Sequence, residues 1–572
     1  MNQEDIKSPD GILAEAQSLA ALPIDEIGSR LTLLRAHYRA APLHFTPAAL
    51  LLLRQAGERA NSVAAEETGR RALAALQEVF GYHSFRAGQM EIIQAVMTGR
   101  DCLAVMPTGA GKSVTYQIPA RLMGGLTLVI SPLISLMKDQ VDAMTEVGIR
   151  ATFLNSSLGS GERSRREAQL QAGEFAMLYA APEGIDASVG WLLDQLDLKM
   201  IAVDEAHCIS EWGHDFRPAY RNLAGLKQRF KGIPILALTA TATPRVKSDI
   251  TTQLALRSPL EIRGSFFRAN LRLYTIKKGQ GAGVRDQILR LVRARHGESG
   301  IIYCLSRKAA ESTAAYLASR GIAAAAYHAG MTPEERASTQ ERFSRDDLDV
   351  VCATIAFGMG IDKSNVRYIL HRDMPRSIEG YYQEIGRAGR DGASADCVLF
   401  YSWADVMSLD RLLESSAVQD SAVAEQQRRA VRRMFDLADT ASCSWRPLVG
   451  YFAESISECG ASCGHCRGQD ILEEAGLAAT APTATARTVL SRERAVQLEG
   501  DPALFERLRA LRRKLADERG VPAYLVFSDK ALQDMAARQP RTRAEFLAVH
   551  GVGQRKLEAY GAAFLAVIRG LK

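Results

Sequence analysis

DCLAVMPTGAGKSVTYQIP, residues 101–119, decides the fold. It begins with an apolar run typical of a buried strand, continues through a glycine-containing turn and ends in a helical pattern. Backbone N–H groups in such a turn and at a helix N-terminus stabilise bound phosphate; Lys112 can then reach the β- and γ-phosphates and Ser113 can hold Mg²⁺. The strict pattern has glycine six positions before Lys112, where this chain has Met106. The motif alone therefore also fits an ordinary strand-to-helix turn.

The surrounding sequence repeats the alternation of strand and helix. From about residue 75 to 400, helical patterns follow the apolar runs LTLVIS, MIAVDE, ILALTAT, GIIYCLS, VVCATI and YILHR. Such strands predict parallel sheets covered by helices on both faces. The alternation breaks at the glycine-rich residues 279–283 and then restarts, which favours two doubly wound α/β domains over one.

Length and composition limit the class of protein. The 572 residues are too many for one core, and 47% hydrophobic with 24% charged residues is typical of a soluble globular protein. No apolar run approaches the ~18 residues of a membrane span. The N-terminus lacks the basic and apolar segments of a secretory signal. We therefore expect a cytoplasmic protein.

The chain also contains segments outside the α/β repeat. We predict a helical extension (1–70), two α/β domains (71–272 and 273–402), a helical subdomain (403–470), a linker (471–499) and a helical domain (500–572). The last domain has fourteen Lys/Arg and eight Asp/Glu, an excess that equals the net charge of +6 of the whole chain. This basic module favours a phosphate backbone as partner, although a solvated helical surface explains the same charge.

Two further motifs suggest nucleotide chemistry. IAVDEAH places Asp204 and Glu205 at the carboxyl end of an apolar strand, where ligands bind in open α/β sheets. Asp204 would support Mg²⁺ and Glu205 would orient or deprotonate the attacking water. In YYQEIGRAGRDG, Arg387 and Arg390 can project from one helical face and neutralise γ-phosphate charge, although this motif taken alone favours a basic helix surface.

Nine cysteines fall into two groups. Five are single residues in apolar segments, as expected of small core residues: Cys102, Cys208, Cys304, Cys352 and Cys397. The other four, Cys443, Cys459, Cys463 and Cys466, have the spacing C-x15-C-x3-C-x2-C. Four thiolates at such spacing predict a tetrahedral Zn²⁺ site.

Together these stretches resemble the RecQ family of superfamily 2 DNA helicases. FGYHSFRAGQ, SPLISLMKDQV, LTATAT, YHAGM, ATIAFGMGIDKSNVR and SIEGYYQEIGRAGRDG occur in the order of that family's motifs. The resemblance implies two RecA-like domains and assigns Tyr82 to stacking on adenine and Gln89 to hydrogen-bonding the edge of the base, with Arg86 nearby. It further implies that residues Thr108, Gly109, Ala110, Gly111 and Asp362 contact the nucleotide and that Gln383 takes part in catalysis.

The resemblance also assigns a role to the segment DEAHCISEWGHDFRPAYR, residues 204–221. In this family an aromatic-rich loop after the DEAH motif senses single-stranded DNA. Trp212 and Phe216 would stack on bases, and each contact would contribute ~1–3 kcal/mol. His214 and Arg217 would transmit the signal to the carboxylates. A core position is the usual alternative for such aromatic residues, but their charged neighbours disfavour it.

The C-terminal third resembles the family's zinc-binding subdomain and, from residue 502, its HRDC domain. HGVGQRKL (550–557) could place backbone amides near phosphate, and Arg555 and Tyr560 are candidate DNA contacts. The family's winged-helix domain has no room between Cys466 and Gly500.

We therefore expect an ATP- and Mg²⁺-dependent 3′-to-5′ DNA helicase of recombination and repair that contains Zn²⁺, with polarity taken from the resemblance. A DNA-stimulated ATPase or translocase without efficient strand separation, an RNA helicase and a nucleic-acid scaffold with a decayed ATPase are the alternatives. The resemblance adds single-stranded-DNA-binding protein and topoisomerase as partners, and association with the nucleoid in a bacterium.

Overall fold

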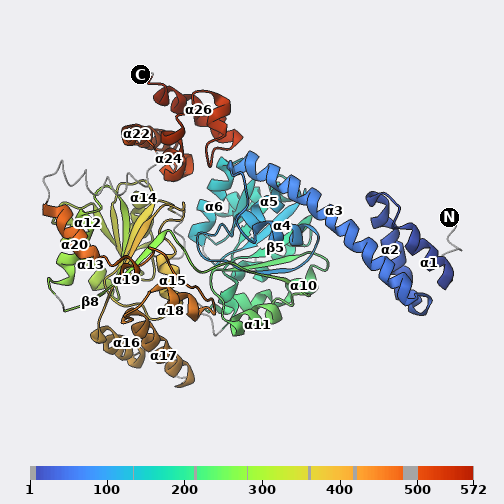
Figure 1. Cartoon of the computed structure of the whole chain (residues 1–572), viewed down its shortest axis with the longest axis horizontal. Coiled ribbons are helices and arrows are strands. Elements are labelled where there is room, and N and C mark those ends of the chain that lie inside the picture. Colours follow the sequence, from blue (N-terminus) through green and yellow to red (C-terminus); the bar gives the residue numbers. More distant parts are fainter. Residues whose placement is uncertain are drawn as a thin grey trace. The chain divides into compact units, whose positions relative to one another are not determined.

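The computed structural model describes residues 8–132, 134–156, 158–187, 189–210, 216–279, 281–357, 363–415, 421–480 and 500–570 (Figure 1). The chain forms two compact units, Met1–Ala74 and Ala75–Lys572. The first unit contains α1 (Pro9–Ser18), α2 (Ile24–Ala40), the 3-10 turn η2 (Pro42–His44) and most of α3 (Pro47–Phe80). Ser8 caps α1 by accepting from the N–H of Gly11 at 3.1 Å. The helices bury one apolar cluster that includes Ile12, Ile27 and Leu34.

The first lobe of the second unit is built on a seven-stranded sheet. Its strands are β1 (Cys102–Val105), β2 (Leu126–Ile130), β3 (Ala151–Leu154), β4 (Met177–Ala180), β5 (Leu198–Val203), β6 (Ile235–Thr239) and β7 (Leu260–Arg263). Their order is β3-β4-β2-β5-β6-β1-β7, and all pairs are parallel. The phosphate-loop strand β1 therefore lies between β6 and β7, and β5, which precedes Asp204, lies beside β6.

Helices cover both faces of this sheet. They are α4 (Gln89–Met97), α5 (Val114–Leu122), α6 (Ile134–Glu146), α7 (Ser160–Gln171), α8 (Pro182–Ala187), α9 (Gly190–Leu193), η3 (Ala206–Ile209), η4 (Pro218–Gly225), α10 (Leu226–Arg229) and α11 (Pro244–Gln253). Alternate strand residues enter two separate apolar clusters: Leu103 and Ile201 in one, Ala104 and Met200 in the other. This alternation is the pattern of a sheet buried on both sides.

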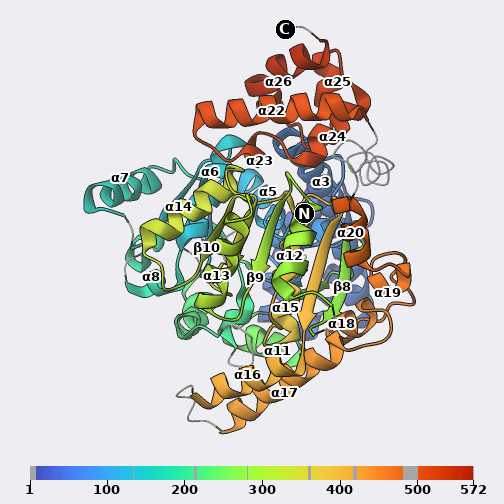
Figure 2. The same cartoon turned by 90° about the vertical axis from the view of Figure 1, so that its left-hand side faces the viewer.

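The second lobe repeats the arrangement with six strands. They are β8 (Leu271–Lys277), β9 (Ser299–Tyr303), β10 (Ala324–Tyr327), β11 (Val350–Ala353), β12 (Val366–His371) and β13 (Ala395–Tyr401), in the order β10-β11-β9-β12-β13-β8. All pairs are again parallel. The helices are α12 (Val284–Arg293), α13 (Arg307–Ala318), α14 (Pro333–Ser344) and α15 (Ile378–Ile385), and Figure 2 shows α12 and α13 in front of the strands. The prediction of two doubly wound parallel-sheet domains is confirmed.

A helical subdomain follows the second lobe. It contains α16 (Trp403–Ser415), α17 (Ser421–Ala438), α18 (Trp445–Tyr451) and α19 (Gly464–Arg467). Its buried Trp445 donates through Nε1 to the carbonyl of Ser462 at 2.8 Å, and Leu273 of β8 forms a bridge with Cys463. The subdomain is therefore packed onto the edge strand of the second sheet.

The segment that we predicted as a linker is partly helical. Residues Ile471–Thr480 form α20, because Ile471 and Ala475 bury themselves in the apolar cluster that α12 contributes to. We predicted that the chain has no room for a winged-helix domain between Cys466 and Gly500. Most of that stretch, residues 481–499, lies outside the described residues.

The C-terminal domain is small and entirely helical. It contains α22 (Pro502–Arg519), α23 (Ala523–Val526), α24 (Asp529–Arg538), α25 (Arg543–Leu547) and α26 (Gln554–Ile568), which bury one cluster around Phe527, Phe546 and Phe564. The five single cysteines of the α/β lobes are all buried, as predicted. Within the described ranges no helix combines the length and apolarity required to cross a membrane.

Candidate active site

The phosphate loop occupies the turn between β1 and α5. Gly109 and Gly111 adopt φ of 82° and 79°, a conformation that L side chains rarely adopt. A Cβ on Gly111 would lie 2.6 Å from Nε2 of Gln89, so the loop packs closely against the Gln89 side chain at this glycine. Lys112 donates from Nζ to the carbonyl of Met106 at 3.3 Å. The variant position Met106 is thus compatible with a folded phosphate loop.

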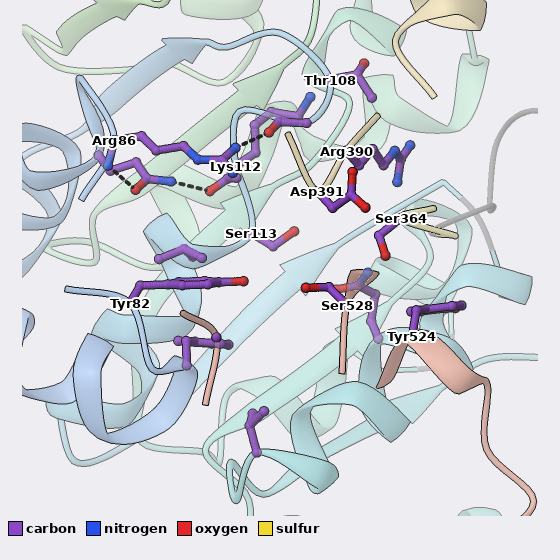
Figure 3. Close-up of a pocket in the computed structure, with 18 of the residues that line it drawn as sticks. Tyr82, Arg86, Thr108, Lys112, Ser113, Ser364, Arg390, Asp391, Tyr524 and Ser528 are labelled. Atoms are coloured by element: carbon purple, nitrogen blue, oxygen red, sulfur yellow. Dashed lines mark hydrogen bonds between the residues drawn. The ribbon is translucent and has the colours of Figure 1, made fainter. Parts of the chain in front are cut away.

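Residues of the FGYHSFRAGQ motif lie against this loop. Gln89 donates from Nε2 to the carbonyls of Ala110 (3.1 Å) and Gly111 (2.9 Å), and its Oε1 accepts from the N–H of Arg86 at 2.8 Å. The Arg86 guanidinium donates to the carbonyl of Gly109. Figure 3 shows Tyr82 and Arg86 at the same pocket, which both residues line. The residues that the resemblance assigns to the base are therefore brought together beside the phosphate loop.

The acidic pair lies directly after β5. Burial and, to a smaller extent, the neighbouring Glu205 raise the pKa of Asp204 to about 6, although Lys112 opposes the rise. Glu205 adopts φ of 47°, a left-handed conformation that is uncommon for a residue with a Cβ. Two partly buried carboxylates with one nearby lysine leave excess negative charge, which a divalent cation would offset.

His207 is a site residue that sequence reasoning missed. The buried ring has Nδ1 2.9 Å from Oγ1 of Thr239 and 3.3 Å from a carboxylate oxygen of Glu205. Thr239 ends β6, and its hydroxyl donates to the carbonyl of Thr241 at 2.9 Å. His207 therefore connects the acidic pair to the LTATAT segment; its place in the DEAH motif was the available signal.

Arg268 is the second missed residue. From the segment between β7 and β8 it donates to the carbonyl of Thr108 in the phosphate loop at 3.0 Å. The same guanidinium donates to the carbonyls of Gly386 (3.1 Å), Ala388 (3.1 Å) and Gly389 (2.7 Å) in the second lobe. One side chain thus joins the phosphate loop to the arginine motif. No sequence pattern singled it out.

The second lobe supplies two arginines to the same pocket. Arg387 is only 8% exposed, and its Nε has no hydrogen-bond partner among the described residues. Such a buried donor is costly unless a ligand accepts from it, which fits a phosphate oxygen. Arg390 lies beside the pocket in Figure 3.

One cavity of about 690 Å³ collects these side chains. The predicted residues that line it are Tyr82, Arg86, Gln89, Thr108, Gly109, Gly111, Lys112, Ser113, Asp204, Glu205, Gln383, Arg387 and Arg390. Ala110 contributes the carbonyl that accepts from Gln89. Asp362 lies outside the described residues. The size and the donor set fit a nucleoside triphosphate.

The described end of the aromatic loop is connected to the acidic motif. Arg217 donates from its backbone N–H to the carbonyl of Cys208 (2.9 Å) and from its guanidinium to the carbonyl of Pro132 (2.9 Å). The Arg221 guanidinium lies 5.0 Å from the centre of the partly exposed Phe216 ring. Trp212 and His214 lie outside the described residues.

The four clustered cysteines form one site. The sulfur atoms of Cys443, Cys459, Cys463 and Cys466 all lie within 4.8 Å of one another. Zn–S bonds of about 2.3 Å in a tetrahedron place sulfurs roughly 3.8 Å apart, so this donor set fits zinc. The predicted ligands are therefore brought together.

The C-terminal domain corrects one expectation. Tyr560, a candidate DNA contact, is 2% exposed, and its hydroxyl accepts from Arg519 (3.0 Å) and donates to Glu146 of the first lobe (3.3 Å). The N–H of Gly551, expected to face phosphate, donates to the carbonyl of Gly81 at 3.1 Å. These groups were assigned wrongly because Glu146 and Gly81, their partners in the first lobe, lie more than 400 residues away in the sequence.

Comparisons with known proteins follow the same division of the chain. Family models match residues 86–250 (DEAD/DEAH box helicase), 283–392 (helicase conserved C-terminal domain), 403–467 (RecQ zinc-binding) and 501–568 (HRDC domain). The solved structure of Mss116p bound to ssRNA and AMP-PNP is 14% identical, with a TM-score of 0.50 over 69% of this chain and 94% of that chain; this likeness concerns the fold alone.

Curated relatives share far more sequence. ATP-dependent DNA helicase RecQ of Pasteurella multocida is 38% identical, with 87% of this chain and 93% of that protein covered. ATP-dependent DNA helicase RecQ of Bacillus subtilis is 36% identical, with 87% and 98% covered. Because these relatives are at least 36% identical and are matched over nearly their whole length, and because the chain matches the family models for both helicase lobes, the RecQ zinc-binding subdomain and the HRDC domain, the chain belongs to the RecQ family of ATP-dependent DNA helicases.

Proposed function

We propose that this chain hydrolyses ATP to move along DNA in the 3′-to-5′ direction and to separate its strands in recombination and repair. The observation that carries the proposal is the single cavity in which Lys112 and Asp204 of the first lobe meet Arg387 of the second. A site divided between two lobes couples nucleotide state to the distance between them.

Each part of the cavity has a distinct task. The phosphate loop and Lys112 bind the β- and γ-phosphates, and Tyr82 with Gln89 holds the base. Glu205 orients or deprotonates the attacking water, with His207 fixing its carboxylate. Arg387 and Arg390 stabilise charge on the transferred phosphoryl group when the lobes close; Gln383 supports them.

The residues present also suit a magnesium ion. Ser113 and Asp204 both line the cavity, and the raised pKa of Asp204 reflects negative charge that a cation would offset. Mg²⁺ held by these residues would neutralise charge on the phosphate groups. Asp362, assigned to the nucleotide by resemblance, completes the proposed set.

DNA would act through the segment after the DEAH motif. Arg217 ties the end of this segment to Cys208 and to Pro132. Bases stacked on Trp212 and Phe216, together with His214, would therefore shift the strand end that holds Asp204 and Glu205. Trp212→Ala is expected to retain basal hydrolysis and to lose its stimulation by DNA; normal stimulation would remove the sensor role.

Strand separation on duplexes with a 3′ or a 5′ single-stranded tail tests the proposal, with ATP hydrolysis followed in parallel. We expect opening of the 3′-tailed duplex alone, greater stimulation by DNA than by RNA, and loss of both activities with DNA binding kept in Lys112→Ala. Opening of only the 5′-tailed duplex would contradict the polarity, and hydrolysis in Lys112→Ala would contradict the site.

A second candidate function is translocation without efficient strand separation. Only 33 residues, 467–499, separate the last cysteine from Gly500, too few for an additional DNA-splitting domain, and α20 takes ten of them. DNA-stimulated hydrolysis without opening of either duplex would favour this candidate.

The family resemblance leads us to include two partner proteins in the proposal. Single-stranded-DNA-binding protein and topoisomerase would act on the same DNA intermediates, and association with the nucleoid would follow in a bacterium. Retention of each purified partner by the immobilised chain at physiological salt tests this part.

A further inference from the structure

The loop His550–Gly553 of the C-terminal domain has no task in the function proposed above. It packs against residues 78–82, the segment that leads into Tyr82. A Cβ on Gly81 would lie 2.3 Å from the carbonyl carbon of Val552, and one on Gly553 would lie 2.6 Å from the carbonyl oxygen of Val79. Glycine is therefore required on both sides of this contact, which marks a fitted interface.

The loop places an aromatic ring against the base-stacking residue. The centres of the His550 and Tyr82 rings are 5.0 Å apart, with the planes inclined by 33°. The loop itself is fixed, because the N–H of His550 donates to the carboxylate of Asp534 at 2.8 Å. Burial lowers the pKa of His550, and Lys530 lowers it further, so a neutral ring faces Tyr82.

The domain is held on both sides of the nucleotide cavity. On the first lobe, Tyr560 donates to Glu146 at 3.3 Å. On the second lobe, Arg509 donates to the carbonyl of Gly297 at 2.9 Å and Arg513 pairs with Asp347 at 2.6 Å. Figure 3 shows Tyr524 and Ser528 of this domain at the same pocket as Tyr82 and Lys112.

We propose that His550 is a positioning residue for the base pocket: the C-terminal domain holds the Tyr82 ring in the orientation that stacks on the nucleobase. The inference rests on the proposed function, in which Tyr82 binds the base. It adds the C-terminal domain to the nucleotide site and explains why the HGVG loop is fitted to residues 78–82.

His550→Ala tests this with two probes, AMP-PNP and inorganic tripolyphosphate, whose dissociation constants are measured on the full chain without DNA. Aromatic pairs of this kind correspond to a factor of about 2–12 in affinity. We expect AMP-PNP to bind more weakly by such a factor and tripolyphosphate to bind as in the parent chain. In steady-state hydrolysis, KM for ATP rises while kcat at saturating ATP changes little.

Two further variants separate positioning from general damage. His550→Phe retains a ring and is expected to restore AMP-PNP binding, whereas Gly553→Ala, which pushes the loop off Val79, is expected to reproduce His550→Ala. The matched control is Gln554→Ala, since within the described residues the exposed Gln554 side chain hydrogen-bonds only to Glu558 on its own helix.

Unchanged AMP-PNP binding in folded His550→Ala and Gly553→Ala would overturn the proposal, as would equal weakening of both probes. Failure of the proposed function gives a different result, because the parent chain itself would then not bind AMP-PNP or hydrolyse ATP.

Discussion

Arg268 illustrates what one residue can do at a boundary between lobes. Its planar guanidinium donates hydrogen bonds both to a carbonyl of the phosphate loop and to carbonyls of the turn 386–389. Burial lowers its pKa, but an arginine remains protonated. Four carbonyl acceptors in two lobes match the geometry of a guanidinium and no other side chain.

Arg268→Lys should therefore impair hydrolysis while the positive charge is kept. A lysine ammonium is compact and cannot donate to both lobes in this geometry. Since hydrogen bonds to charged groups contribute about 1.5–3 kcal/mol, we expect kcat for DNA-stimulated hydrolysis to fall roughly 10- to 100-fold. Exposed Lys231→Ala serves as the control. Wild-type kcat in the Arg268 variant would show that the bridge has no part in catalysis.

Asp204 gives a prediction about pH. Its pKa is raised to about 6, so the carboxyl is ionised above that pH and becomes protonated as the pH falls through it. A protonated carboxyl is a poor Mg²⁺ ligand, and Mg²⁺ in turn favours the ionised form. We expect kcat/KM for ATP to decline below pH about 6, with the decline moving to lower pH as Mg²⁺ is raised. If the decline of kcat/KM at low pH does not move when the Mg²⁺ concentration is changed, the titrating group is not Asp204.

At the scale of elements, the cysteine site depends on two short helices and the loop between them. Cys463 caps α19 and accepts from the N–H of Cys466 at 3.4 Å, and Trp445 at the start of α18 fixes the loop through Ser462. These helices have seven and four residues, too few to be stable without tertiary contacts. A metal bound by all four cysteines would supply the missing stability.

Cys463→Ser should lower the thermal stability of the subdomain and abolish stoichiometric zinc. Structural zinc contributes ~10–16 kcal/mol of apparent folding energy in small zinc modules, so the loss should be large. Zinc content by elemental analysis and melting with and without chelator measure both effects. Cys352→Ala, in the core of the second lobe, is the matched control: it should retain zinc and remain sensitive to chelator. A zinc-free parent chain would contradict the assignment.

At the scale of the whole molecule, the proposed function depends on communication between the segment after the DEAH motif, our candidate DNA sensor, and the cavity. The Arg217 guanidinium reaches the carbonyl of Pro132, which follows β2, while its backbone reaches Cys208. These contacts join the loop to two neighbouring strand ends of the first sheet. Coupling through so few hydrogen bonds can be interrupted without removing the phosphate-binding groups.

Arg217→Ala should consequently uncouple DNA from hydrolysis. Basal hydrolysis is expected to persist, because the side chain lies outside the nucleotide cavity. Stimulation by single-stranded DNA should fall at least several-fold, since hydrogen bonds of a charged donor contribute about 1.5–3 kcal/mol. Rates at increasing DNA concentration measure the effect. Full stimulation at saturating DNA would mean that Arg217 contributes to the affinity for DNA and not to the coupling between DNA and hydrolysis.

The sequence by itself determined the two parallel sheets, the phosphate loop, the acidic pair and the four thiolates. Each is a local pattern: period, spacing and residue type within one segment are sufficient for it. Only the tertiary structure decided those features that depend on contacts between residues far apart in the sequence. Arg268 joins two lobes, His207 meets Thr239, α20 forms against α12, and the HGVG loop meets Gly81 rather than phosphate. Such contacts depend on shape and burial after folding, which no local pattern encodes.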